Sequence, residues 1–167
     1  MTVEYRAGTV ADIPAIDRVF RDSFDDTFGH LYRPEDLSAF MTQFTPETWA
    51  KEMESCAFRL AEADGEIVGF LKLGPLTLPV ETDQPAIELR QLYLVKDWHG
   101  RGLAHALTDW AIAEARRQGA RELYLTVYTD NHRARRFYDK YGFVEVGPYA
   151  FMVGNHADED IIMKLVL

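Results

Sequence analysis

Two glycines near residue 100 stand where the backbone can bind an anion, between an apolar strand and a long helix. Residues 92–105 read Leu-Tyr-Leu-Val-Lys-Asp-Trp-His-Gly-Arg-Gly-Leu-Ala-His. Gly100 and Gly102 lack a Cβ atom, so backbone N–H groups can crowd around an anion at this turn. The helix that should follow adds unpaired N–H groups and the positive end of its dipole. The segment therefore predicts a phosphate-binding turn.

The residues after the turn decide which kind of phosphate site this is. A P-loop needs Lys and then Ser or Thr after its last glycine, but Leu103 and Ala104 follow Gly102. A dinucleotide fingerprint needs a third small residue where His105 stands. The segment instead resembles the acyl-CoA loop of the GNAT superfamily of N-acetyltransferases, which reads Arg or Gln, two residues, Gly, one residue, then Gly or Ala. Gly102 and Ala104 match this pattern, while His99 replaces the Arg or Gln.

A second motif of the same superfamily follows about thirty residues later. Residues 131–143 read Asn-His-Arg-Ala-Arg-Arg-Phe-Tyr-Asp-Lys-Tyr-Gly-Phe, against the superfamily pattern Asn-x-x-Ala-x-x-Phe-Tyr-x-x-x-Gly-Phe. Two motifs in the right order are much harder to obtain by chance than either one alone. The resemblance extends over the whole chain in element order and is strongest from Glu88 to Phe143. The matching residues of the second motif are Asn131, Ala134, Phe137, Tyr138, Gly142 and Phe143.

Hydrophobic periodicity and turn signals place these motifs in an α/β chain, read as a single domain over residues 1–167. Asp64-Gly65 predicts a hairpin, and glycines 119 and 142 are expected to end two helices. The resemblance implies the GNAT fold, a mixed seven-stranded sheet with helices on both faces and splayed fourth and fifth strands. The predicted strands cover 3–7, 57–63, 66–73, 86–94, 122–127, 143–153 and 160–167, and the predicted helices cover 12–27, 102–118 and 131–141, with two short helices starting at 34 and 46.

The resemblance implies that acetyl-CoA is the co-substrate and that its pantetheine arm lies in the gap between the splayed strands. Its amides would pair with the backbone of Leu92 and Leu94. Arg101 is expected to bind phosphate, since a guanidinium does so bidentately. Asn131 reads both as a helix cap and as a pantetheine contact. The predicted cofactor-binding residues are Leu92, Tyr93, Leu94, His99, Gly100, Arg101, Gly102, Leu103, Ala104, Asn131 and Ala134.

Acetyl transfer to an amine needs a base for the ammonium group and an acid for the departing thiolate. The resemblance makes Tyr138 the acid, with ordinary packing of a half-buried tyrosine as the alternative. The resemblance also implies that the backbone N–H of Leu94 stabilises the thioester oxygen as it gains charge. Glu88 lies four residues before Leu92 on one strand, so even spacing predicts a shared sheet face. The resemblance implies that a Glu here acts as base, directly or through water. A structural pairing of Glu88 with Arg90 is the alternative.

Other polar residues are expected to have no catalytic role. His156, Asp158 and Asp160 alternate in what reads as a polar turn, and no metal site is predicted. Arg133, Arg135 and Arg136 are a second candidate for binding the CoA phosphates, but a solvated helix face is favoured for them. Cys56 is the only cysteine, which rules out an internal disulfide and favours a cytoplasmic protein. A signal peptide and a membrane-spanning segment are not expected.

Charge is unevenly distributed along the chain and points to the acceptor. The formal net charge is −8 over residues 1–66 and +4 over residues 90–140. This balance argues against nucleic-acid binding and suits an anionic cofactor with a cationic small-molecule amine. Residues 26–37 also resemble Pai-type enzymes that acetylate spermidine and spermine, which makes a polyamine the leading acceptor. The acids expected to line its site are Asp25, Asp26, Glu35 and Asp36.

Several alternatives to direct transfer onto a small amine stay open at this stage. The chain could be a non-catalytic CoA-binding sensor module, in which Tyr138 and Glu88 are structural. It could instead acetylate protein or peptide N-termini, or another small amine. A dinucleotide oxidoreductase is disfavoured by His105. The oligomeric state is also open, with a homodimer as one alternative.

Overall fold

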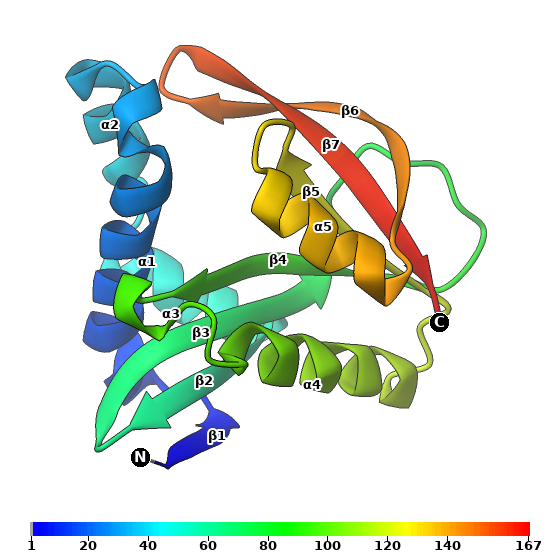
Figure 1. Ribbon diagram of the computed structural model, residues 1–167, viewed down its shortest axis with the longest axis horizontal. Coiled ribbons are helices and arrows are strands. Elements are labelled where there is room, and N and C mark those ends of the chain that lie inside the picture. Colours follow the sequence, from blue (N-terminus) through cyan, green and yellow to red (C-terminus); the bar gives the residue numbers. More distant parts are fainter. Residues whose placement is uncertain (1) are drawn as a thin grey trace.

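A single mixed sheet runs through the computed structural model, which describes residues 2–167 (Figure 1). Its strand order is β1-β2-β3-β4-β5-β7-β6. The pair β4–β5 is parallel and every other neighbouring pair is antiparallel. The predicted seven-stranded mixed sheet is therefore confirmed. The strands are β1 (Val3–Ala7), β2 (Ala57–Ala63), β3 (Glu66–Pro75), β4 (Ala86–Leu94), β5 (Glu122–Tyr128), β6 (Val144–Val153) and β7 (His156–Val166).

Helices cover both faces of the sheet, as expected. The first three helices bury an aromatic cluster against one face, in which Phe20, Trp49 and Phe70 are almost fully enclosed. The last two helices bury a mainly aliphatic cluster on the other face. No helix within residues 2–167 has the length and apolar character needed to cross a membrane. The helices are α1 (Ile13–Phe28), α2 (Pro34–Met41), α3 (Pro46–Ser55), α4 (Leu103–Arg117) and α5 (His132–Tyr141), with 3-10 turns η1 (Val10–Asp12), η2 (Gly29–Leu31) and η3 (Lys96–Trp98).

Local signals placed most element boundaries correctly. The Asn131 side chain accepts a hydrogen bond from the backbone of Ala134, which caps α5, and Gly142 ends that helix with φ +97°. The final hairpin differs from its prediction. Its turn is limited to residues 154–155, so β7 begins at His156 and not near residue 160. The polar stretch expected to form a turn is therefore part of a strand.

Strands β4 and β5 pair only over a short distance and then separate, which confirms the predicted splay. Residues Ala86–Glu88 pair with Glu122–Tyr124, and beyond them β5 pairs only with β7. On its other side β4 stays paired with β3, and the N–H of Val95 donates to the carbonyl of Val68 at 2.9 Å. Hydrogen-bonded and non-hydrogen-bonded pairs alternate in an antiparallel ladder, so the backbone groups of Leu92 and Leu94 point away from β3. They face the gap left by β5.

The segment from η2 to α2 is joined to the turn between β6 and β7 (Figure 1). The N–H of Asn155 donates to a carboxylate oxygen of Asp36 at 3.0 Å, and Arg33 donates to the other oxygen at 3.1 Å. Gly154 has φ +58°, and a Cβ atom there would lie 2.6 Å from the Cα atom of Asp36. Glycine is therefore required at residue 154 for both conformation and space.

We predict that Gly154→Ala lowers the free energy of unfolding by an amount on the order of 1–3 kcal/mol, because the new methyl group meets Asp36 in a strained backbone conformation. Denaturant unfolding measures this change. Gly147→Ala on β6 is the matched control and should change stability little, because no atom lies within 4 Å of the position that its methyl group would take. Equal effects of the two substitutions would contradict the proposed packing of this turn.

Candidate active site

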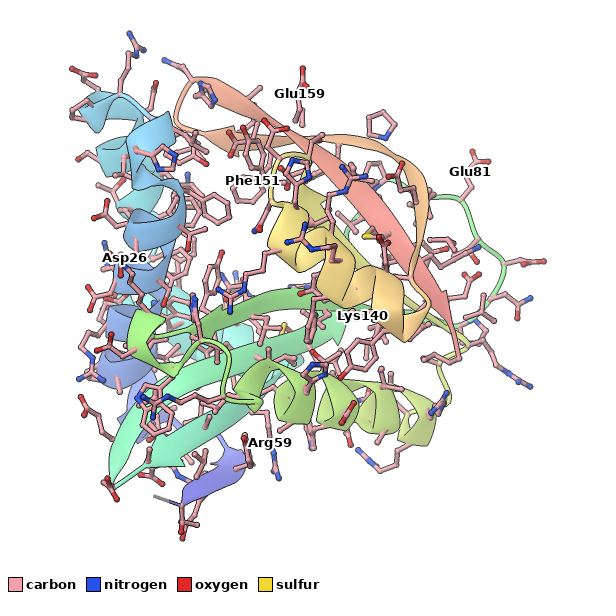
Figure 2. The ribbon with its side chains drawn as sticks, viewed as in Figure 1. Asp26, Arg59, Glu81, Lys140, Phe151 and Glu159 are labelled. Atoms are coloured by element: carbon pink, nitrogen blue, oxygen red, sulfur yellow. The ribbon has the colours of Figure 1, made fainter. Side chains whose placement is uncertain are left out.

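The gap between β4 and β5 opens into a cavity of about 700 Å³ that reaches from the N-terminus of α4 to the hairpin of β6 and β7. Its walls come from α1, β4, β5, α4, α5 and the last two strands. Figure 2 shows two of its lining residues, Asp26 on α1 and Lys140 on α5. The predicted site residues that line it are Leu92, Tyr93, Leu94, His99, Gly100, Gly102, Ala104, Asn131, Ala134 and Tyr138.

The predicted phosphate turn is built as its sequence suggested. Gly100 and Gly102 have φ values of +75° and +87°, which favour glycine strongly. Gly102 is the N-cap of α4 and makes no side-chain capping bond, so the first N–H groups of the helix lack intrahelical partners. Leu103 buries its side chain in the core, and only its backbone is suited to the predicted role. This end of the cavity can bind an anion through N–H groups and the helix dipole.

His99 has a structural explanation that its sequence position did not suggest. One ring nitrogen, Nε2, lies 3.1 Å from the carbonyl oxygen of Leu94, and Nδ1 lies 3.2 Å from a guanidinium nitrogen of Arg133. The carbonyl can only accept and the guanidinium can only donate, so the proton belongs on Nε2. His99 thereby links the end of β4 to the first turn of α5 and orients Arg133 at the cavity.

The basic side chains that line the cavity differ from the one predicted. The guanidinium of Arg101 lies 4.7 Å from the ring centroid of Trp98, and Arg101 does not line the cavity. Arg133, Arg136 and Lys140 do line it, although from sequence a solvated helix face is favoured for the two arginines and Lys140 is not singled out. Their spacing of three and four residues puts them on one face of α5, a signal that was present in the sequence.

Tyr138 lies deep in the cavity, with 8% of its surface exposed. Its ring packs against Phe137 and Phe143 at centroid distances of 5.3 and 5.5 Å. Burial raises the pKa of the Tyr138 hydroxyl, which keeps the group protonated near neutral pH. A protonated hydroxyl in this position can donate a proton to a leaving group in the cavity.

Glu88 does not reach the cavity, and the prediction that it shares a sheet face with Leu92 is wrong. Lys72 of β3 pairs with Gln91 and Leu73 pairs with Leu89, so Arg90 is an extra residue in β4. This β-bulge reverses the facing of the strand, and even spacing no longer means a shared face. The Glu88 carboxylate instead accepts hydrogen bonds from the backbone N–H and the hydroxyl of Thr77, both at 2.9 Å.

Acidic and aromatic side chains form the opposite end of the cavity. Asp158 and Asp160, on the same face of β7, are buried and line it together with Tyr32 of the α1–α2 connection. The hydroxyl of Tyr32 donates to Asp158, and Nε2 of His156 lies 3.2 Å from the second oxygen of that carboxylate. Of the four acids expected here, Asp26 lines the cavity. Asp25 and Glu35 do not, and Asp36 is engaged by the hairpin turn.

Asp160 differs from its neighbour because its carboxylate has neither a hydrogen bond nor an ion pair within residues 2–167, although only 8% of the residue's surface is exposed. Burial, and next the charge of Asp158, raise the pKa of Asp160 to about 7. The sequence reading missed this residue because it assigned 156–160 to a polar turn. In the structure the buried Asp158 and Asp160 alternate with the exposed Ala157 and Glu159, as in a strand with one buried face, but the residue types in this segment do not alternate.

No group of three His, Cys, Asp or Glu side chains in the described part of the chain is arranged to hold a metal ion. Cys56 is buried, and burial raises the pKa of its thiol. It is not among the residues that line the cavity. The side chains in the cavity that could take part in acid–base chemistry or bind charged groups are therefore tyrosines, carboxylates and basic residues. They surround the unpaired backbone edge of β4.

Comparison with known proteins assigns this architecture to a family. The family model described as "Acetyltransferase (GNAT) family" matches residues 16–143. An uncharacterized N-acetyltransferase of Lactobacillus delbrueckii subsp. lactis is 29% identical over 160 residues, which cover 93% of this chain and 92% of the relative. An uncharacterized N-acetyltransferase of Mycobacterium tuberculosis is 38% identical over 107 residues, covering 64% and 65% of the two chains.

Solved structures share the fold at low sequence identity. The PaiA N-acetyltransferase from Thermoplasma acidophilum, in complex with coenzyme A, has a TM-score of 0.81 and 22% identity, with full coverage of both chains. Arabidopsis thaliana NAA60, in complex with a bisubstrate analogue, has a TM-score of 0.76 and 18% identity, covering 99% of this chain and 98% of the other. The chain belongs to the acetyltransferase (GNAT) family. The predicted N-acetyltransferase class, with acetyl-CoA as co-substrate, is confirmed.

We predict that Gly102→Val weakens acetyl-CoA binding at least about tenfold, equivalent to about 1.4 kcal/mol. A β-branched side chain is strained at φ +87° and blocks close approach to the backbone of the turn. Isothermal titration calorimetry measures the change. Gly65→Val carries a similar backbone strain at φ +79° in the remote β2–β3 turn and should leave affinity unchanged. Undiminished binding by Gly102→Val would remove this turn from the cofactor site.

Proposed function

We propose that the protein transfers the acetyl group of acetyl-CoA directly to a primary amine of a small cationic molecule, with a polyamine such as spermidine as the leading acceptor. The observation that carries this proposal is the opposite charge of the two ends of one cavity. Arg133, Arg136 and Lys140 lie at the cofactor end, and Asp158 and Asp160 lie at the other. A polyanionic cofactor and a cationic amine would each meet a complementary surface.

The cofactor would lie along the open edge of β4. The N–H groups of the Gly100–Ala104 turn and the basic face of α5 suit its phosphates. The free N–H and C=O groups of Leu92 and the free N–H group of Leu94 suit the cofactor, much as they would suit a peptide strand. The carbonyl of Leu94 already accepts hydrogen bonds from His99 and from Ser23, at 3.1 and 2.9 Å. Its N–H remains available to the thioester oxygen.

Tyr138 has the chemistry required of the acid in this proposal. Its hydroxyl would protonate the sulfur as the carbon–sulfur bond breaks, while the N–H of Leu94 would stabilise the charge that develops on the carbonyl oxygen. A reactive cysteine has little support, because Cys56 is buried outside the cavity. Direct transfer within a ternary complex is therefore favoured over an acyl-enzyme.

A peptide or protein N-terminus is the second acceptor class, since a ribosomal-protein-alanine N-acetyltransferase from Brucella melitensis shares the fold. The contact between α2 and the β6–β7 turn favours a small molecule instead. Asp36 and Asn155 are hydrogen-bonded, Gly154 packs on Asp36, and Phe40 contacts Phe151 at a centroid distance of 5.7 Å. These contacts would have to open if an extended peptide passed between the two segments.

We predict that Tyr138→Phe lowers kcat by about 10- to 1,000-fold, because it removes only the acidic hydroxyl and keeps the ring packing. Acetyl-CoA affinity should stay within about twofold of the wild type. The measurement is steady-state kinetics with saturating amine, after single-turnover experiments have shown that chemistry limits the rate. Tyr124→Phe, which removes another buried hydroxyl away from the cavity, is the control. An unchanged kcat for Tyr138→Phe would refute the role as acid.

A screen of acetyl-CoA turnover with polyamines, amino acids, aminoglycosides and peptide N-termini tests the acceptor. We expect spermidine or a similar polyamine to give the highest kcat/KM. The KM for the amine should increase with ionic strength, because salt screens its attraction to the acidic end. Efficient acetylation of peptides with no transfer to polyamines would overturn this acceptor. No turnover with any amine, despite CoA binding, would favour the sensor module.

A further inference from the structure

We propose that Asp160 is the general base that removes a proton from the acceptor ammonium group. This inference rests on the proposed acetyl transfer and adds a residue to it. Asp160 has a buried carboxylate that lines the cavity and has no hydrogen-bonding or ionic partner within residues 2–167. A carboxylate that is largely buried and left without a protein partner is costly unless water or a ligand compensates it. A cationic amine entering the cavity would supply that partner.

The location of Asp160 connects it to the proposed acid. It lies opposite Tyr128 in the β5–β7 ladder, at the end of β5 that has separated from β4. Tyr93 of β4 also lines the cavity, and burial, followed by the charges of Asp160 and Tyr138, raises the pKa of Tyr93. The three side chains therefore border one region beside the open edge of β4. A proton acceptor and a proton donor flank the space where an amine would meet a thioester.

The surroundings of Asp160 distinguish it from Asp158. Asp158 accepts a hydrogen bond from Tyr32 at Oδ2, and its Oδ1 lies 3.2 Å from Nε2 of His156 without a hydrogen bond, so one of its two oxygens is already engaged. Burial, together with the nearby charge of Asp158, raises the pKa of Asp160 to about 7. A base with this pKa is partly ionised at neutral pH and holds a proton strongly enough to accept one. The ionisable groups around Asp160 are Asp158, Tyr128, Tyr149, Tyr32 and Tyr93, and the same cavity is also lined by Asp26, Lys96 and the basic face of α5.

The proton balance of the reaction is complete with Asp160 and Tyr138. One proton of the ammonium group passes to a carboxylate oxygen of Asp160, which leaves a neutral amine. The nitrogen lone pair forms the new carbon–nitrogen bond, the carbon–sulfur bond breaks, and the sulfur receives the proton of Tyr138. The nitrogen then loses its second proton, which restores Tyr138 directly or through water. Asp160 finally releases its proton to solvent.

The decisive experiment compares pH profiles of kcat/KM for the amine in the wild type, Asp160→Asn and Glu88→Gln. We expect the wild-type value to rise with pH through about 7, as Asp160 ionises. Asp160→Asn should lower kcat/KM about 100-fold or more at neutral pH and remove the levelling-off above pH 7, so that the value keeps rising with pH. Its activity should then follow the free fraction of the amine and approach the wild type near the pKa of the amine, at about 10.

Glu122→Gln is the matched control, because Glu122 is also a buried carboxylate, on β5, but hydrogen-bonded and outside the cavity. It should keep the wild-type profile. Calorimetry with acetyl-CoA shows whether Asp160→Asn is folded, and equal affinity is expected. A wild-type kcat/KM that is flat between about pH 6 and 8 would contradict the proposal without any variant, since a base with a pKa near 7 must titrate there.

Three further results would overturn the assignment. If Asp160→Asn retains the wild-type pH profile while acetyl transfer proceeds, the assignment of Asp160 as the base is wrong and the proposed function stands. A higher KM with unchanged kcat would make Asp160 a binding residue, and loss of the pH dependence in Glu88→Gln would make Glu88 the base. Failure of the wild type to acetylate any amine would overturn the proposed function together with this inference. That result differs from the three above, in which acetyl transfer still proceeds.

Discussion

The early separation of β4 from β5 is the constraint on which the rest of the site depends. A parallel pair that continued beyond Glu88 and Tyr124 would occupy the backbone edge at Leu92 and Leu94 and leave no cavity. Each strand is held on its other side, β4 by β3 and β5 by β7, so the separation does not expose an unsupported strand. The sheet therefore presents unpaired N–H and C=O groups inside the protein, where they bind a ligand in place of a neighbouring strand.

The surroundings of the gap give its two ends different chemistry. The N-terminus of α4 and the basic face of α5 favour negative charge at one end. At the other end β7 directs Asp158 and Asp160 inward, and Tyr32 crosses from the first half of the chain to hold Asp158. His99 ties β4 to Arg133 of α5, so that the edge of the sheet and the basic face are positioned together. Acceptor and cofactor would thus meet where the strands diverge.

Local sequence signals were sufficient to predict features that neighbouring residues determine, such as helix ends and tight turns. Asn131 and Gly142 bound one helix, and Asp64 and Gly65 both have the positive φ values of a tight hairpin. The predictions were wrong where pairing with a strand distant in the sequence determines the local structure. The bulge at Arg90 follows from pairing with β3, and it turned Glu88 away from the cavity. The strand character of residues 156–160 depends on pairing with β5 and β6, which the polar composition of the segment concealed.

Amide hydrogen exchange at the open edge of β4 tests the central claim most directly. The account predicts that saturating CoA slows exchange at Leu92 or Leu94 at least about tenfold, because the ligand takes the place of the missing strand. The amide of Tyr93, which the ladder directs toward β3, should change little and serves as the internal reference. Unchanged exchange at both leucines, with CoA bound and Tyr93 protected as before, would contradict the assignment of this gap as the cofactor site.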